Sequence, residues 1–197
     1  MSLKDDILGV FTEDMTDEDF AKGIADAIGT FTGACSFVVA PTPLVGTDAS
    51  PSGAFSGSAT VSWQIDTSQI ENSIKGACTE SMTDADLAQA IADGLDAAAP
   101  QWSGSISGTT TVPGTPPTPT PSSDSISVTS TFTSATVNTG LVACFQAMGN
   151  MQQGGDEYMA TQMAALITAY YTGSVNVLAG ASHLSAVQGS ITVMAGA

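Results

Sequence analysis

Residues 12–28 read TEDMTDEDFAKGIADAI, and residues 79–95 read TESMTDADLAQAIADGL. Ten of these seventeen positions carry the same residue in both segments, at a constant separation of 67. A fainter third copy, MATQMAALI, occupies residues 159–167. Repetition at a fixed period indicates one supersecondary unit that is used several times. The repeat therefore predicts three tandem modules, at residues 1–66, 67–133 and 134–197.

Each module is predicted to begin with a short helix. Two apolar residues stand four positions apart in that helix, so both face the same side of it. The first members of the pairs follow the period of 67 without a gap. The pairs are Ile7 with Phe11, Ile74 with Cys78, and Leu141 with Phe145.

A second helix is predicted to follow the first in each module. Thr16 and Thr83 are its expected N-caps, because Asp19 and Asp86 stand three residues later and can complete a capping box. The third copy has five extra residues before this helix. The predicted buried stripes are Phe20, Ile24 and Ile28; Leu87, Ile91 and Leu95; and Met159, Met163 and Ile167.

A β-hairpin is predicted to close each module. The expected first strands lie at 37–39, 105–111 and 173–178, and the second strands at 59–65, 126–132 and 189–194. Residues of alternating polarity, clearest from Ala59 to Ile65, indicate half-exposed antiparallel strands. The hairpin tip of the second module is rich in proline, between residues 112 and 121. We therefore expect an α+β fold of three helix–helix–hairpin repeats, with helices packed on one face of an antiparallel sheet. A pseudo-threefold arrangement of the modules is the alternative.

The charge of the chain is acidic and uneven. The chain has no arginine, three lysines and 19 acidic residues, for a net charge of -16. Direct nucleic-acid binding is not expected, because it requires clustered basic residues, and a polybasic membrane anchor is not expected either. Residues 159–197 contain no Asp, Glu, Lys or Arg. Since free monomers normally cover their surface with charge, we expect the third module to be the main interface.

Two further features bear on the compartment. The N-terminal residues lack the apolar segment of a signal peptide, and no apolar run is long enough to span a membrane. Cys35, Cys78 and Cys144 lack a CxxC spacing and are expected to be reduced. These features predict a protein that is made in the cytoplasm.

No catalytic, cofactor or metal site is expected. His183 is the only histidine, so any catalytic Ser–His or Cys–His pair would have to use it. The acidic run at residues 13–19 lacks the spacing of a calcium loop, and helix capping explains it. Trp63 and Trp102 are expected to be core or interface anchors.

The Ala-rich helices followed by Gly/Ser/Thr-rich, proline-tipped hairpins resemble virion structural proteins of tailed bacteriophages. The segment ITAYYTGSVNV, at residues 167–177, carries this resemblance most clearly. The resemblance implies a non-enzymatic component of the capsid decoration, neck, tail or baseplate. It also implies a virion location after synthesis in the host cytoplasm.

Under this hypothesis the partners are other virion proteins and further copies of the chain itself. The alternative is a carbohydrate- or ligand-binding surface module that uses Trp63, Trp102 and the proline-rich tips. The residues predicted to form interfaces lie in the second hairpin tip and in the third module: Pro116, Pro117, Pro119, Pro121, Val175, Val177, His183, Leu184, Ile191 and Val193.

Overall fold

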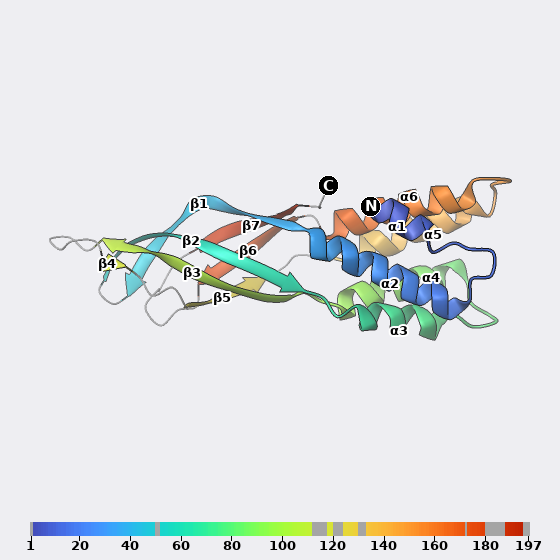
Figure 1. Cartoon of the computed structure of the whole chain (residues 1–197), viewed down its shortest axis with the longest axis horizontal. Helices are drawn as coiled ribbons and strands as arrows, with labels where there is room; N and C mark the ends of the chain where they lie inside the picture. Colours follow the sequence, from blue (N-terminus) through green and yellow to red (C-terminus); the bar gives the residue numbers. More distant parts are fainter. Residues whose placement is uncertain are drawn as a thin grey trace.

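The computed structural model is an elongated molecule with helices at one end and strands at the other (Figure 1). It describes the backbone of residues 2–49, 52–111, 118–119, 124–129, 133–171, 173–179 and 188–194. Side chains are described for residues 2–35, 62–101 and 133–171. All statements on side-chain contacts below refer to these three ranges.

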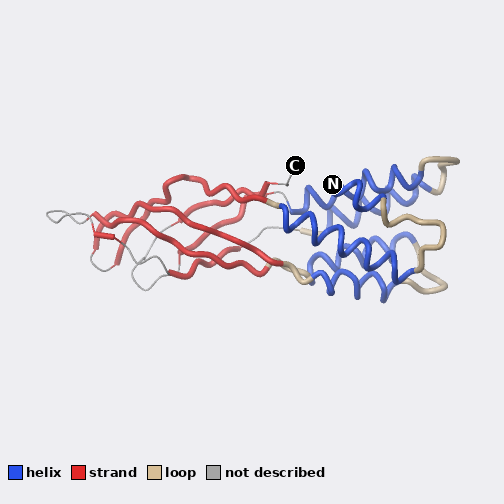
Figure 2. The backbone as a smooth tube through the Cα atoms, viewed as in Figure 1, coloured by secondary structure: helices blue, strands red, loops and turns tan. Residues whose placement is uncertain are grey.

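The helices form an up-and-down bundle, seen as the blue tubes in Figure 2. They contact one another in chain order, and α6 returns to α1, so the contacts close a ring. The first helix of each module is antiparallel to the second, because each second helix leads into the strands and the following first helix leads away from them (Figure 1). The helices are α1 (Leu3–Leu8), α2 (Asp17–Ala34), α3 (Thr67–Ala77), α4 (Asp84–Ala97), α5 (Ala135–Met148) and α6 (Gly155–Tyr171).

Side-chain caps determine where the helices begin. Thr16 caps α2 and Thr83 caps α4, each in a reciprocal capping box with the Asp three residues later, as predicted. In the second box the Asp86 amide donates to Thr83 Oγ1 at 3.2 Å, and the Thr83 amide donates to Asp86 Oδ2 at 2.9 Å. Asp66 is the N-cap of α3, and its side chain accepts a hydrogen bond from the Ser68 amide. Ser134 stands at the N-cap position of α5 but makes no side-chain capping hydrogen bond.

The core of the bundle repeats with the modules. Apolar residues at equivalent positions of the three helix pairs are buried together, and most of them have no exposed surface. Leu87 is the one member of the predicted stripes that is only partly buried. The equivalent buried sets are Leu3, Ile70 and Val137; Ile7, Ile74 and Leu141; Ile24, Ile91 and Met163; and Ile28, Leu95 and Ile167.

The strands extend from the end of the bundle where the second helices finish (Figure 1). Antiparallel backbone pairs join β1 to β2, β2 to β3, β3 to β4 and β5, β5 to β6, β6 to β7, and β7 back to β1. The strands are β1 (Ser36–Ala49), β2 (Ser52–Gln64), β3 (Gln101–Thr111), β4 (Thr118–Pro119), β5 (Asp124–Thr129), β6 (Gly173–Ala179) and β7 (Gln188–Met194).

The expected α+β fold, with helices packed on one face of an antiparallel sheet, is wrong. In the ranges described with side chains, helices make up 71% of the residues, and the single short strand at 62–64 forms no sheet there. The apolar stripes of the helices face other helices, so the bundle has a core of its own. The strands lie beyond the end of this bundle and are not covered by it (Figure 2). Within its described residues, the protein is a six-helix bundle that continues into strands.

The five extra residues of the third module lengthen a helix. Helix α3 ends at Ala77. Helix α5 continues for one turn beyond the residue that is equivalent to Ala77, and ends at Met148. The hairpin of α5 and α6 therefore protrudes beyond the other two at the free end of the bundle (Figure 1).

Candidate functional site

The predicted interface residues fall in the strand region, where side chains are not described. Pro116, Pro117, Pro121, His183 and Leu184 lie outside the described residues altogether. Of the others, Pro119 is in β4, where its backbone pairs with that of Thr109. Val175 and Val177 are in β6, and Ile191 and Val193 are in β7.

The third-module strands have backbone partners on both sides. Ile191 stands opposite Val39 of β1 and opposite Val175 of β6. Val177 stands opposite Val128 of β5 and opposite Gly189 of β7. Because both neighbours come from the same chain, β6 and β7 do not offer open edges for strand addition along these registers.

Two equivalent grooves lie on the outside of the bundle. The groove between α1 and α2 has a volume of about 530 Å³, and the groove between α3 and α4 has a volume of about 420 Å³. Their linings correspond at a separation of 67, which shows that the repeated sequence builds a repeated surface. The corresponding pairs are Asp6 and Ser73, Gly9 and Gly76, Val10 and Ala77, Thr12 and Thr79, Asp19 and Asp86, Gly23 and Ala90, and Asp26 and Asp93.

Most of the carboxylates that line the grooves are engaged in local structure. Asp19 and Asp86 complete the capping boxes described above, and Asp5 caps α1 through Ser2. Asp26 pairs with Lys22 one turn earlier in α2. Asp93 accepts a hydrogen bond from Gln89 Nε2 at 2.6 Å. The expected explanation of the acidic repeats as helix caps is confirmed for Asp19 and Asp86.

These hydrogen bonds hold the capping carboxylates in the ionised form. Bonds from the hydroxyl and the backbone amide of Thr83 lower the pKa of Asp86, and bonds from Thr16 lower the pKa of Asp19 in the same way. Bonds from Ser2 lower the pKa of Asp5. A general acid at neutral pH needs a raised pKa instead. These carboxylates are therefore suited to capping and not to proton transfer.

The third helix pair has no counterpart of these grooves among those described. Leu166 of α6 occupies the equivalent place, and it packs directly on Gly140 of α5. A Cβ atom added at Gly140 would lie 2.5 Å from Leu166 Cδ2, so a larger residue there would have to displace the end of the Leu166 side chain.

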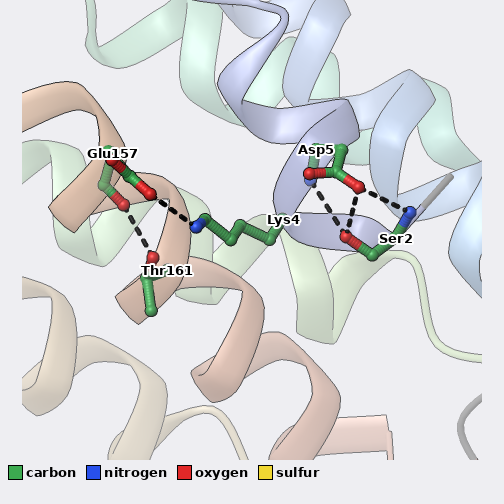
Figure 3. Close-up of polar contacts among 5 residues, drawn as sticks. All are labelled: Ser2, Lys4, Asp5, Glu157 and Thr161. Atoms are coloured by element: carbon green, nitrogen blue, oxygen red, sulfur yellow. Dashed lines mark hydrogen bonds and ion pairs between the residues drawn. The ribbon is translucent and has the colours of Figure 1, made fainter.

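The contacts between neighbouring modules differ in chemistry. Lys4 Nζ of α1 lies 2.8 Å from Glu157 Oε1 of α6, and Figure 3 shows the lysine reaching across to the last helix. Lys75 of α3 pairs with Glu18 of α2. Between the second and third modules, Asn138 Nδ2 of α5 donates to Gln89 Oε1 of α4, and the hydroxyls of Ser134 and Tyr170 donate to the Asp96 carboxylate. The three interfaces between neighbouring modules, which we call seams, are otherwise similar. Because their polar contacts differ, one order of the modules around the ring is favoured.

An aromatic cluster joins the bundle to the strands. Trp63 is 8% exposed, donates from Nε1 to the Thr32 carbonyl at 3.0 Å, and packs edge-on against Tyr171 with ring centroids 5.4 Å apart. Tyr170 Oη donates to Asp96 Oδ1 at 3.1 Å. Burial, together with Asp96, raises the pKa of Tyr170.

These contacts confirm Trp63 as a core anchor. Its buried ring cannot serve as the stacking platform of a carbohydrate site. The side chain of Trp102, whose backbone pairs with Trp63, lies outside the described side chains. None of the aromatic side chains in the three described ranges is exposed.

The described residues contain no group of three or more His, Cys, Asp or Glu side chains that could hold a metal ion. No disulfide joins Cys35, Cys78 and Cys144, all of which have described side chains. Burial raises the pKa of the Cys78 and Cys144 thiols, so it disfavours their reactive thiolate forms. Within the described part of the chain, no helix is both long and apolar enough to cross a membrane.

Comparisons with protein-family models, with curated proteins and with solved structures find no match to this chain.

Proposed function

We propose that this protein is a non-enzymatic structural component of a tailed-bacteriophage particle, in the capsid decoration, neck, tail or baseplate. The observation that carries the proposal is the closed arrangement of three repeated helix pairs, whose contacts return from α6 to α1. Such a molecule offers similar surfaces on several sides and two unlike ends. These are properties of a building block that contacts several neighbours.

The use of the polar residues supports the same proposal. The repeated acidic motif forms helix caps at Thr16 and Thr83 and does not converge on an enclosed cavity. The net charge of -16, with no arginine, opposes contact with packaged DNA and suits a position outside it. The partners are then other virion proteins and further copies of this chain.

Detection of the chain in particles tests the proposal. An antibody raised against the purified chain is used for immunoblotting and immunogold electron microscopy of particles from a lysed culture that encodes it. Several copies per particle are expected, and the position of the gold distinguishes capsid, neck, tail and baseplate. Abundant chain in the lysate that is missing from washed particles would contradict the proposal.

A further inference from the structure

The three loops at the free end of the bundle, drawn in tan in Figure 2, share one backbone turn. In each loop the amide of a methionine donates a hydrogen bond to the carbonyl three residues earlier. The turns join Met15 to Thr12, Met82 to Thr79 and Met151 to Met148, with donor–acceptor distances of 3.2, 3.0 and 2.9 Å. The repeated unit therefore places a methionine in each of the three loops at this end.

Two of these three methionine side chains are exposed to solvent. Met82 is 36% exposed and Met151 is 42% exposed. Within the three ranges that have described side chains, they are the two large apolar residues that are exposed. Met15 is partly buried and packs against the core instead. The free end of the bundle thus carries two accessible thioether groups.

We propose that Met82 and Met151 are a reversible oxidation site, at which hydrogen peroxide changes the free end of the bundle from apolar to polar. A thioether is apolar, whereas a sulfoxide is polar, and methionine sulfoxide reductases restore the thioether. The inference goes beyond the proposed function and does not depend on it, because it concerns the chemistry of the isolated chain.

The oxidation needs hydrogen peroxide as its one co-reactant. The lone pair of the methionine sulfur attacks one peroxide oxygen, so an S–O bond forms while the O–O bond breaks. The second oxygen takes the proton of the first and leaves as water. The sulfur loses two electrons and the peroxide gains them. Because hydrogen peroxide is uncharged, the net charge of -16 does not keep it from the surface.

The fold separates these two methionines from those of the core. Met82 and Met151 lie outside the helices, and neither belongs to the core cluster. Met159 and Met163 of α6 are 8% and 0% exposed. Peroxide therefore reaches their sulfur atoms only when the bundle opens. Oxidation of the two exposed methionines changes the surface of a bundle that stays folded.

The first test is mass spectrometry of the full chain over a time course in hydrogen peroxide. Fragmentation of its peptides assigns the added oxygen to each methionine separately. We expect sulfoxide to form at Met82 and Met151 about tenfold faster, or more, than at Met159 and Met163, whose reaction waits for opening. Equal rates at the exposed and the core methionines of the folded chain would overturn the inference.

The second test measures polarity by hydrophobic interaction chromatography under native conditions. Peroxide should shorten the retention of the wild-type chain, and a methionine sulfoxide reductase should restore it. The double variant Met82→Leu/Met151→Leu keeps two apolar side chains without sulfur, so it should show about half of the wild-type shift or less. Equal shifts in wild type and double variant would also overturn the inference.

Met148→Leu is the matched control, because Met148 lies at the same end of the bundle but packs against the core. Its peroxide-induced shift in retention should equal that of the wild type. Circular dichroism melts establish that the variants are folded. Oxidation at Met82 and Met151 should leave the thermal unfolding midpoint within about 2 °C of that of the untreated chain. A midpoint that falls further in wild type than in the double variant would contradict the placement of these side chains outside the core.

Discussion

Lys4 and Glu157 lie 153 positions apart in the sequence, yet Lys4 Nζ approaches Glu157 Oε1 to 2.8 Å. The pair connects α1, the first helix, to α6, the last, and so lies on the seam that closes the ring. The Glu157 side chain is largely accessible to solvent, and the Lys4 side chain is partly accessible. Their mutual interaction raises the pKa of Lys4 and lowers that of Glu157, so both remain charged near neutral pH.

Replacing Lys4 with Ala should lower the thermal unfolding midpoint slightly at low salt, because solvent screens an exposed ion pair. The difference from wild type should disappear at high salt. Differential scanning calorimetry at two ionic strengths checks this. Lys22→Ala is the control, since Lys22 pairs with Asp26 inside one helix and spans no seam. A large loss of stability that persists in high salt would show that more than the ion pair depends on Lys4.

Replacing Thr83 with Ala should reduce the free energy of unfolding by about 1 kcal/mol, because the N-cap of α4 loses its side-chain acceptor. Urea denaturation followed by circular dichroism measures this. Ser81→Ala, in the preceding loop, should change the free energy by no more than about 0.5 kcal/mol. Equal effects of the two substitutions would contradict the capping role of Thr83.

The contribution of Asp86 to stability should depend on pH. Its folded-state pKa is lowered by Thr83, so its stabilising effect is present above the unfolded-state value of about 3.9 and is lost as pH falls through the folded value. Asp86→Ala should therefore destabilise the chain at pH 7 and cost progressively less below about pH 4. Thermal melts of wild type and variant are measured in parallel, so that the pH dependence of stability that both proteins share is subtracted. A constant difference down to pH 2 would argue against the linkage.

Glycine substitutions should separate close packing from helix propensity. A Cβ atom at Gly94 of α4 would lie 3.0 Å from Ile70 Cα of α3, so Gly94→Ala should destabilise by about 1–3 kcal/mol through overpacking. Gly33 of α2 is exposed and has no heavy atom within 4 Å of an added Cβ, so Gly33→Ala should stabilise by about 0.5–1 kcal/mol. Chemical denaturation of both variants gives the two signs. A stabilised Gly94→Ala variant would disprove the close approach of α3 and α4.

Replacing Trp63 with Phe should destabilise the chain by about 1–3 kcal/mol, because the smaller ring loses contacts and the hydrogen bond to the Thr32 carbonyl. Equilibrium denaturation measures the change. Thr30→Ala, at an exposed position near the end of the same helix as Thr32, is the control. A negligible effect of Trp63→Phe would place the indole outside the core.

The helices are predictable from the sequence because their signals are local. Thr16 and Thr83 mark helix starts through the Asp three residues later, and the spacing of 67 aligns Ile7, Ile74 and Leu141, all of which are fully buried. Extending that spacing to every apolar position would also have found Leu3, Ile70 and Val137. These three residues are buried but were missing from the predicted stripes.

The arrangement of the helices is not predictable in the same way. An apolar stripe such as Phe20, Ile24 and Ile28 specifies which side of α2 is buried, but not whether a helix or a sheet covers it. The expectation that a sheet covers the helices was wrong for this reason. The contact of Lys4 with Glu157 and the grooves beside Asp19 and Asp86 also depend on how distant segments pack, which local spacing does not encode.

The extra turn of α5 gives the free end of the bundle a direction. Three helix pairs of equal length would give this end pseudo-threefold symmetry, and a neighbouring protein could then dock on it in any of three orientations. Because α5 continues to Met148, the loop that carries the exposed Met151 stands ahead of the other two loops. A body approaching along the long axis meets this loop first. The added turn thus breaks the pseudo-threefold symmetry of this end and makes the three docking orientations unequal.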